Sequence, residues 1–196
     1  MRFERLRTEV YRANLDVARA GLVVLTWGNV SGVDRRAGVM AIKPSGVDYD
    51  RLRPEDIVVL SLEDGRTVDG RLRASSDTPT HLALYRAFPQ AGGVVHTHST
   101  YATAWAQAGR DLPCLGTTHA DHFRGAVPTT RALTVGEVRG DYEANTGLVI
   151  VECFRQRRLD PVAVPAALVR GHGPFAWGSG PAEAVGNAIA LESVAR

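Results

Sequence analysis

Two histidines, His96 and His98, follow a short apolar segment at residues 92–95 and are spaced two residues apart. In an extended strand alternate side chains point to the same face, so both imidazoles can reach one metal ion. A third candidate, His172, stands between two glycines, which permit close approach of the backbone. Two nearby histidines with a distant third and an open coordination position are typical of catalytic zinc. The pattern predicts a zinc-dependent enzyme.

The sequence leaves two interpretations of Asp77 about even. Within the segment SSDTP at residues 75–79, Asp77 occupies the place of a helix N-cap or first-turn carboxylate. As an anionic oxygen ligand it would instead complete a site of three histidines and one aspartate.

A single histidine on an apolar strand is usually a core residue. Burying two histidines without partners is costly, and this cost favours metal binding by His96 and His98.

Three turns rich in glycine and serine are candidates for binding a phosphate. They contain Gly28 and Asn29, Ser45 and Gly46, and Ser75 and Ser76. Free backbone N–H groups and hydroxyls at such turns favour an anion, although each turn taken alone is only a turn. Lys43 stands beside the second turn and would add a charge-assisted contact to the phosphate. The alternative is that it is a surface lysine next to a proline.

The polar segment at residues 117–123 holds further candidates. Asp121 is a possible general acid or base, and a loop-capping aspartate is the alternative. His119 and His122 are spare metal candidates. His81 is another, but its place on a predicted helix face favours packing or hydrogen bonding.

Composition limits the class of protein. The chain has 196 residues, 44% of them apolar and 22% charged, which is typical of one globular domain, expected to span residues 1–196. A net charge of +2 does not indicate a nucleic-acid partner. The N-terminus lacks the apolar core of a signal peptide, and no stretch approaches the ~20 apolar residues of a membrane span. Two cysteines fit reduced thiols, so we expect a cytoplasmic protein without a membrane partner.

The elements that must position these residues follow from apolar periodicity and turn signals. Strands are predicted at residues 22–25, 39–42, 57–62, 92–98, 148–151 and 167–169. Helices are predicted from Leu6 to Gly21 and at 79–87, 101–108, 133–145 and 181–194. Their irregular order, with a hairpin turn at residues 64–65, predicts an α/β sandwich with a mixed or largely antiparallel sheet.

Five motifs occur in order along the chain: TWGNVS (26–31), KPSGV (43–47), SSDTPTH (75–81), HTHS (96–99) and HGPFAWG (172–178). Together they resemble the L-ribulose-5-phosphate 4-epimerase family of the class II aldolase/epimerase superfamily, which includes the adducin head. The resemblance covers essentially the whole chain. It implies a three-layer α/β/α sandwich assembled as a homotetramer with active sites between adjacent subunits.

The resemblance also implies roles for individual residues. Zinc is assigned to Asp77, His96, His98 and His172, and the three turns to a phosphorylated ketopentose, chiefly its phosphate. The implied reaction interconverts L-ribulose 5-phosphate and D-xylulose 5-phosphate by retro-aldol cleavage of C3–C4 and re-addition with inverted C4. Zinc would act as a Lewis acid, and Asp121 would transfer a proton at the C4 oxygen. Arabinose and ascorbate catabolism both use this reaction.

The sequence departs from the family pattern in two places. The family continues into a C-terminal segment that carries a tyrosine paired with the acid/base aspartate, and none of the five tyrosines here matches it. We therefore expect a domain without that tail. His122 stands where relatives commonly carry tyrosine, and we assign it no role.

Two other functions remain open. Class II sugar-phosphate aldolases such as L-fuculose-phosphate aldolase share the three-histidine site but typically place glutamate where Asp77 stands. Asp77 and Asp121 together favour the epimerase. A non-catalytic adducin-like binding module would be expected to lose zinc ligands, and this chain keeps all four.

Overall fold

The computed structural model describes residues 2–196 and contains one antiparallel sheet in that range. Its strands are β1 (Asn29–Asp34), β2 (Val39–Ile42), β3 (Val58–Ser61), β4 (Thr67–Asp69), β5 (Gly93–His96), β6 (Ala166–Leu168) and β7 (Pro174–Gly178). They lie in the order β4-β3-β2-β1-β5-β7-β6, and every neighbouring pair is antiparallel. The expected mixed or largely antiparallel sheet is therefore antiparallel throughout.

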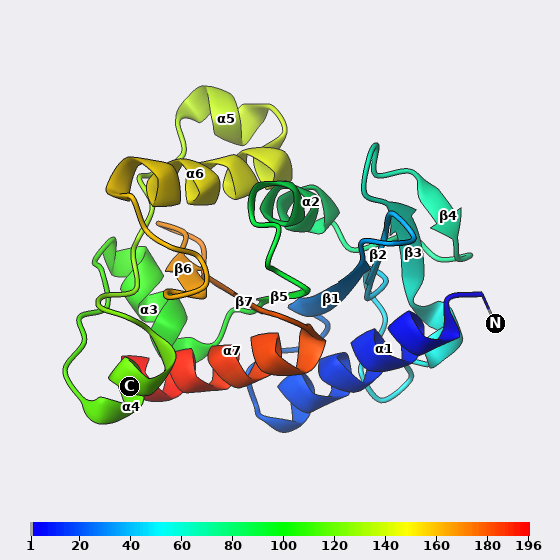
Figure 1. The fold of residues 1–196 in the computed structure, drawn as a ribbon, viewed down its shortest axis with the longest axis horizontal. Coiled ribbons are helices and arrows are strands. Elements are labelled where there is room, and N and C mark those ends of the chain that lie inside the picture. The colour runs from blue at the N-terminus through cyan, green and yellow to red at the C-terminus, as the bar shows by residue number, and fades with distance from the viewer. Residues whose placement is uncertain (1) are drawn as a thin grey trace.

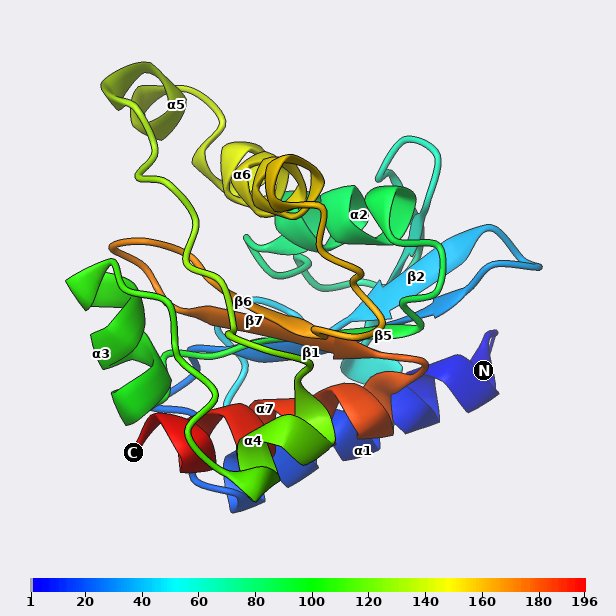
Figure 2. The ribbon, with the colours of Figure 1, turned by 60° about the vertical axis from the view of Figure 1, so that its left-hand side comes forward.

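Helices cover both faces of the sheet. They are α1 (Glu4–Arg19), α2 (Thr78–Ala87), α3 (Thr100–Ala108), α4 (Thr117–His122), α5 (Val135–Arg139), α6 (Tyr142–Arg157) and α7 (Pro181–Ala195), with a 3-10 turn at Pro54–Asp56. Helices α1, α3, α4 and α7 lie on one side of the sheet, and α2 and α6 lie on the other (Figures 1 and 2). This arrangement confirms the expected three-layer α/β/α sandwich.

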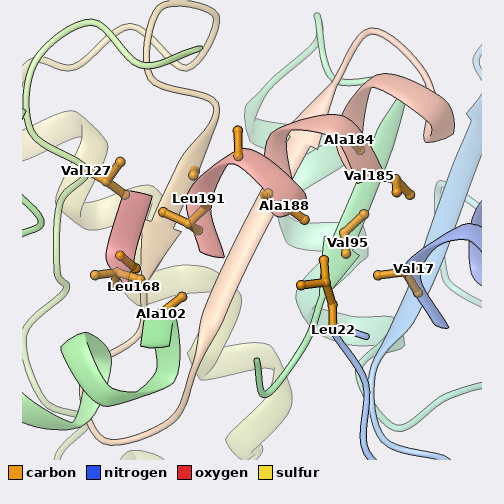
Figure 3. Close-up of a cluster of buried hydrophobic side chains, with 14 of the residues drawn as sticks. Val17, Leu22, Val95, Ala102, Val127, Leu168, Ala184, Val185, Ala188 and Leu191 are labelled. Carbon is orange, nitrogen blue, oxygen red and sulfur yellow. The ribbon is translucent and has the colours of Figure 1, made fainter. Parts of the chain in front are cut away.

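The central strands are buried on both faces, so they carry apolar residues at consecutive positions. In β5, Val94 packs in the cluster between the sheet and helices α2 and α6, whereas Val95 packs in the cluster on the opposite face, between the sheet and α7. Figure 3 shows Val95 near Val17 of α1 and near Ala184 and Val185 of α7. The strand that leads to His96 is thus held rigidly between two packed layers.

Several predicted elements are confirmed with small shifts. In α1, the residues predicted to face the core (Leu6, Val10, Ala13 and Val17) are buried. Strands β2, β3 and β5 and helices α2, α3 and α7 also form where the pattern placed them. Both cysteines are free thiols. No helix within residues 2–196 combines the length and apolarity needed to cross a bilayer.

Three expectations about elements are wrong. Residues 22–25 form no strand, since Val24 is 52% exposed and Leu25 is 73% exposed with a left-handed φ of 55°. Residues 148–151 lie inside α6, and the predicted helix 133–145 is split between α5 and the start of α6. The segment after His172 forms β7, which the sequence analysis did not predict.

Candidate active site

Three histidine side chains meet at the end of β5. The Nε2 atom of His98 lies 3.0 Å from Nε2 of His96 and 3.1 Å from Nε2 of His172. The ligand atoms of all three lie within 4.8 Å of one another. The pairing of β5 with β7 sets His96 opposite Phe175, which brings the preceding turn and His172 to the same place. A metal at this point would join both histidine motifs of the sequence.

The orientation of His96 is fixed by its surroundings. Its Nδ1 atom lies 3.0 Å from the carbonyl oxygen of Pro174. Because a carbonyl can only accept, Nδ1 carries a proton, which in the neutral imidazole leaves the lone pair on Nε2. The imidazole also stacks on Phe175, with ring centroids 4.1 Å apart and planes 12° apart. This partner of the non-ligating nitrogen is the usual support of a metal-binding histidine.

The three imidazoles fit a metal better than they fit each other. Burial and the neighbouring histidines lower the pKa of His98, and lower that of His172 to about 3, so both are neutral at pH 7. His98 Nε2 holds at most one proton, and it cannot both donate to and accept from its two neighbours. Tetrahedral zinc with Zn–N bonds of about 2.0–2.1 Å sets its nitrogens about 3.3 Å apart, close to these separations.

Asp77 is turned toward this cluster and away from the helix it begins. It occupies the N-cap position of α2, but its side chain accepts no capping hydrogen bond. Instead, Asn29 Nδ2 donates to Asp77 Oδ2 at 2.6 Å. Burial raises the pKa of Asp77, but His96, His81, His172 and the Asn29 amide outweigh it, so the pKa lies below its usual value. The carboxylate is anionic; its role as a fourth ligand stays a prediction.

One cavity of about 290 Å³ joins the histidines to the three turns. Every residue predicted to contact the substrate in these turns lines it, namely Gly28, Asn29, Lys43, Ser45, Gly46, Ser75 and Ser76. Gly28 has φ of +90°, and a Cβ there would lie 2.9 Å from Val23 Cγ1 and 3.0 Å from the His96 carbonyl oxygen. The first turn thus packs directly against the backbone of a proposed metal ligand. Contact of these residues with phosphate stays a prediction.

Lys43 carries a buried positive charge into the cavity. Only 2% of the residue is exposed, so the surface-lysine interpretation is wrong. Nζ has two long contacts, both 3.4 Å, to the carbonyl oxygens of Thr26 and Pro44. No carboxylate within residues 2–196 forms an ion pair with it. Burial lowers the pKa of Lys43 to about 8, partly opposed by Asp48, so the side chain is mostly cationic at pH 7. The ammonium therefore lacks a counter-ion that a phosphate would supply.

Four other candidates lie apart from the histidine cluster. Asp121 is exposed and does not line the cavity; its helix, α4, lies on the same side of the sheet as α7 (Figure 2). On the same helix, His119 Nε2 donates to the Gly125 carbonyl at 2.7 Å, and His122 Nδ1 lies 3.4 Å from Asn187 Oδ1. His81 is buried and pairs through Nδ1 with Ser31 Oγ at 2.7 Å, which confirms that it hydrogen-bonds rather than joining the cluster.

Two cavity residues at the start of α6 were not predicted from the sequence. Tyr142 and Glu143 line the cavity, and the Tyr142 ring lies 5.6 Å from the His172 ring, centroid to centroid. Their helix packs against α2, and the Thr80 hydroxyl donates to the Glu143 carbonyl. The available signal was Asp141, whose side chain caps α6 by accepting from Ala144 N–H at 3.1 Å. An N-cap there would have moved the predicted helix start to Tyr142.

Comparison with known proteins identifies relatives of this chain. Residues 8–196 match the family described as Class II Aldolase and Adducin N-terminal domain. A protein of Salmonella paratyphi B named L-ribulose-5-phosphate 4-epimerase UlaF is 55% identical over 193 residues, covering 98% of this chain and 83% of that protein. The protein of the same name from Salmonella paratyphi C is 54% identical with the same coverage.

Solved structures share the fold. An L-fuculose 1-phosphate aldolase superimposes with a TM-score of 0.77 at 25% identity, over 97% of this chain and 84% of the other. The L-fuculose-1-phosphate aldolase of Thermus thermophilus gives a TM-score of 0.75 at 28% identity, over 100% and 93%. The motifs, the antiparallel sandwich and the three-histidine cluster agree with these matches. This chain belongs to the class II aldolase and adducin N-terminal domain family.

Proposed function

We propose that this protein is a metal-dependent L-ribulose-5-phosphate 4-epimerase that interconverts L-ribulose 5-phosphate and D-xylulose 5-phosphate. The observation that carries the proposal is one cavity with a histidine cluster that could hold a metal ion at one side and, at another, the Lys43 cation, which has no ion pair within residues 2–196. A phosphorylated sugar has the matching pair of groups, namely adjacent oxygens for a metal and a dianion for the lysine. The 55% identity to proteins named as this epimerase supports the same substrate.

We propose zinc as the metal, held by His96, His98 and His172 with Asp77 as the fourth ligand. Neutral imidazoles and an anionic carboxylate are donors that zinc favours. When bound, the metal supplies Lewis acidity at the sugar oxygens next to the bond that breaks. The hydrogen bond from His96 to Pro174 and that from Asn29 to Asp77 hold two of the four side chains in place.

Residues that hold the phosphate would explain how C4 is inverted without release of glycolaldehyde phosphate. Cleavage of the C3–C4 bond gives the enediolate of dihydroxyacetone and glycolaldehyde phosphate. With its phosphate held by Lys43 and the turns around Gly28, Ser45 and Ser75, the aldehyde can rotate and present its other face. Re-addition at that face inverts C4. We assign to Asp121 the proton transfer at the C4 oxygen.

We propose a homotetramer in which Asp121 acts in the cavity of a neighbouring subunit. Asp121 is exposed and lies outside the cavity of its own chain. Beside the cavity, Val24, Leu25 and Trp27 are each more than half exposed, which is an apolar rim suited to a second copy. The substrate carries a dianion that does not cross a bilayer unaided, so we propose a cytoplasmic location.

A subunit-mixing experiment tests the shared site. We expect Asp121→Asn and His98→Ala proteins to be inactive alone and to regain about a quarter of wild-type activity after mixed reassembly. In a random equal mixture, about a quarter of the sites combine an intact His98 from one subunit with an intact Asp121 from its neighbour. No recovery, with mixed oligomers verified by mass spectrometry, would contradict the assignment of Asp121 to a neighbouring cavity.

Product identification tests the reaction. Zinc-loaded protein is incubated with L-ribulose 5-phosphate, and products are followed by NMR. We expect D-xylulose 5-phosphate without free fragments. Dihydroxyacetone and glycolaldehyde phosphate without epimer would instead indicate the aldolase alternative, which the fuculose aldolase structures support only as the same fold. No conversion would favour the adducin-like binding module.

A further inference from the structure

Tyr49 connects two of the turns that line the cavity. Its ring lies under Lys43, with Nζ 4.6 Å from the ring centroid. Its hydroxyl donates to the Gly28 carbonyl oxygen at 2.8 Å. Tyr49 itself does not line the cavity, so any influence on a bound ligand passes through these two neighbours.

The ring compensates a cation that has little other support. Lys43 is buried and has no ion pair in the described part of the chain, and its two carbonyl contacts are long at 3.4 Å. An aromatic face attracts a desolvated ammonium, and the attraction grows as water is excluded. The ring also occupies one side of the ammonium, which leaves the remaining N–H donors for the cavity.

The hydroxyl holds the turn that contains Gly28. Burial raises the pKa of Tyr49, so the hydroxyl keeps its proton and remains a donor throughout the physiological range. Its acceptor, Gly28, has φ of +90° and packs against the His96 carbonyl, so the turn has little room to move. Tyr49 therefore contacts both Lys43 and the turn that contains Asn29.

We propose that Tyr49 is a positioning residue for the phosphate of the substrate, with its ring orienting Lys43 and its hydroxyl holding the Gly28 turn. The identity of the substrate rests on the proposed function, but the recognised chemistry is a phosphate dianion. The same chemistry occurs in inorganic phosphate, which serves as a probe independent of any reaction.

Calorimetric titration with inorganic phosphate tests this role in the zinc-loaded protein. We expect Tyr49→Leu to weaken phosphate binding about tenfold, and Tyr49→Phe, which keeps the ring, to weaken it less than about threefold. Zinc content should stay at the wild-type level in both. Tyr101→Leu is the matched control, because its ring faces the Arg196 guanidinium at 5.8 Å, outside the cavity. It should leave phosphate binding unchanged.

A double-mutant cycle separates positioning from general structural damage. In a Lys43→Met background, followed at millimolar phosphate, Tyr49→Leu should cause less than about a twofold further loss. An equal loss in both backgrounds, or loss of zinc in Tyr49→Leu and Tyr49→Phe alike, would overturn the proposal.

Turnover of L-ribulose 5-phosphate distinguishes this inference from the proposed function. We expect Tyr49→Leu to raise KM about tenfold with kcat nearly unchanged, because the lost contact serves bound substrate and transition state alike. An active enzyme whose KM is unaffected by Tyr49→Leu would overturn the positioning role alone. The expected phosphate-binding pattern in a protein that does not epimerise the sugar would support the positioning role and overturn the proposed function.

Discussion

A single methyl group at Gly173 should loosen the proposed metal site without touching a proposed ligand atom. Gly173 follows His172, and a Cβ built on it would lie 2.9 Å from the Thr97 carbonyl oxygen and 3.4 Å from His98 Cδ2. A carbon–oxygen contact of 2.9 Å is too short, so the segment that carries His98 must shift by a few tenths of an ångström. Gly173 has no left-handed φ that would strain an alanine. The effect of Gly173→Ala is therefore steric and directed at His98.

The size of the effect follows from packing. Inserting one methyl group into a packed interior costs about 1–3 kcal/mol, so we expect the metal-free protein to lose about 1–2 kcal/mol of unfolding free energy. Displacing the support of a ligand typically lowers metal affinity about 10–100-fold, and we expect a loss of at least about tenfold here.

Chelator competition and urea unfolding measure the two effects. Zinc affinity is obtained by titration against a chromophoric chelator, and stability by unfolding of the chelator-treated protein. Gly186→Ala is the control, because Gly186 is exposed in α7 with no heavy atom within 4 Å of a built Cβ. It should gain about 0.5–1 kcal/mol of stability with unchanged zinc affinity. Wild-type zinc affinity in Gly173→Ala would refute the tight approach of residue 173 to the His98 segment.

Three further perturbations have defined outcomes. Burial lowers the pKa of Lys43 to about 8, and the proposed phosphate contact needs the cationic form, so kcat/KM should fall as pH rises through about 8; a flat profile from pH 7 to 9 would contradict this. Asp121→Asn should reduce kcat by at least about 100-fold with zinc content intact, and loss of the metal would refute its proton-transfer role. Leu84→Ala removes a fully buried side chain and should cost about 2–5 kcal/mol in urea unfolding without altering the zinc affinity of the folded protein; a cost below about 1 kcal/mol would show that the site repacks.

The residues that meet in the cavity could be predicted because their chemistry is local in sequence. The spacing of His96 and His98 already places two imidazoles together, even though β5 ends at His96 and His98 lies in the following loop. Gly171 and Gly173 flank His172, and the close approach predicted there is found at Gly173. The turns at Gly28, Ser45 and Ser75 could be picked out as candidates from their glycine and serine content alone.

Other features depend on packing that no short segment specifies. Residues 148–151 are an apolar run that fits a strand or a helix equally well, and α6 is favoured because Ile150 and Phe154 pack toward α2 and the sheet. Residues 22–25 have strand composition, but none of the strands found within residues 2–196 pairs with them. Tyr49 reached its place beneath Lys43 through the fold of the loop after β2, which its own residue type does not reveal.

The most direct test is the zinc stoichiometry of the purified protein, measured by atomic emission beside His172→Ala and the remote control Gly186→Ala. If the three imidazoles hold a metal, the wild-type protein and the control bind one zinc per chain and His172→Ala retains less than about a tenth of it after dialysis. A wild-type protein that epimerises the sugar without bound metal, or His172→Ala that keeps a full equivalent, would contradict a three-histidine catalytic metal site.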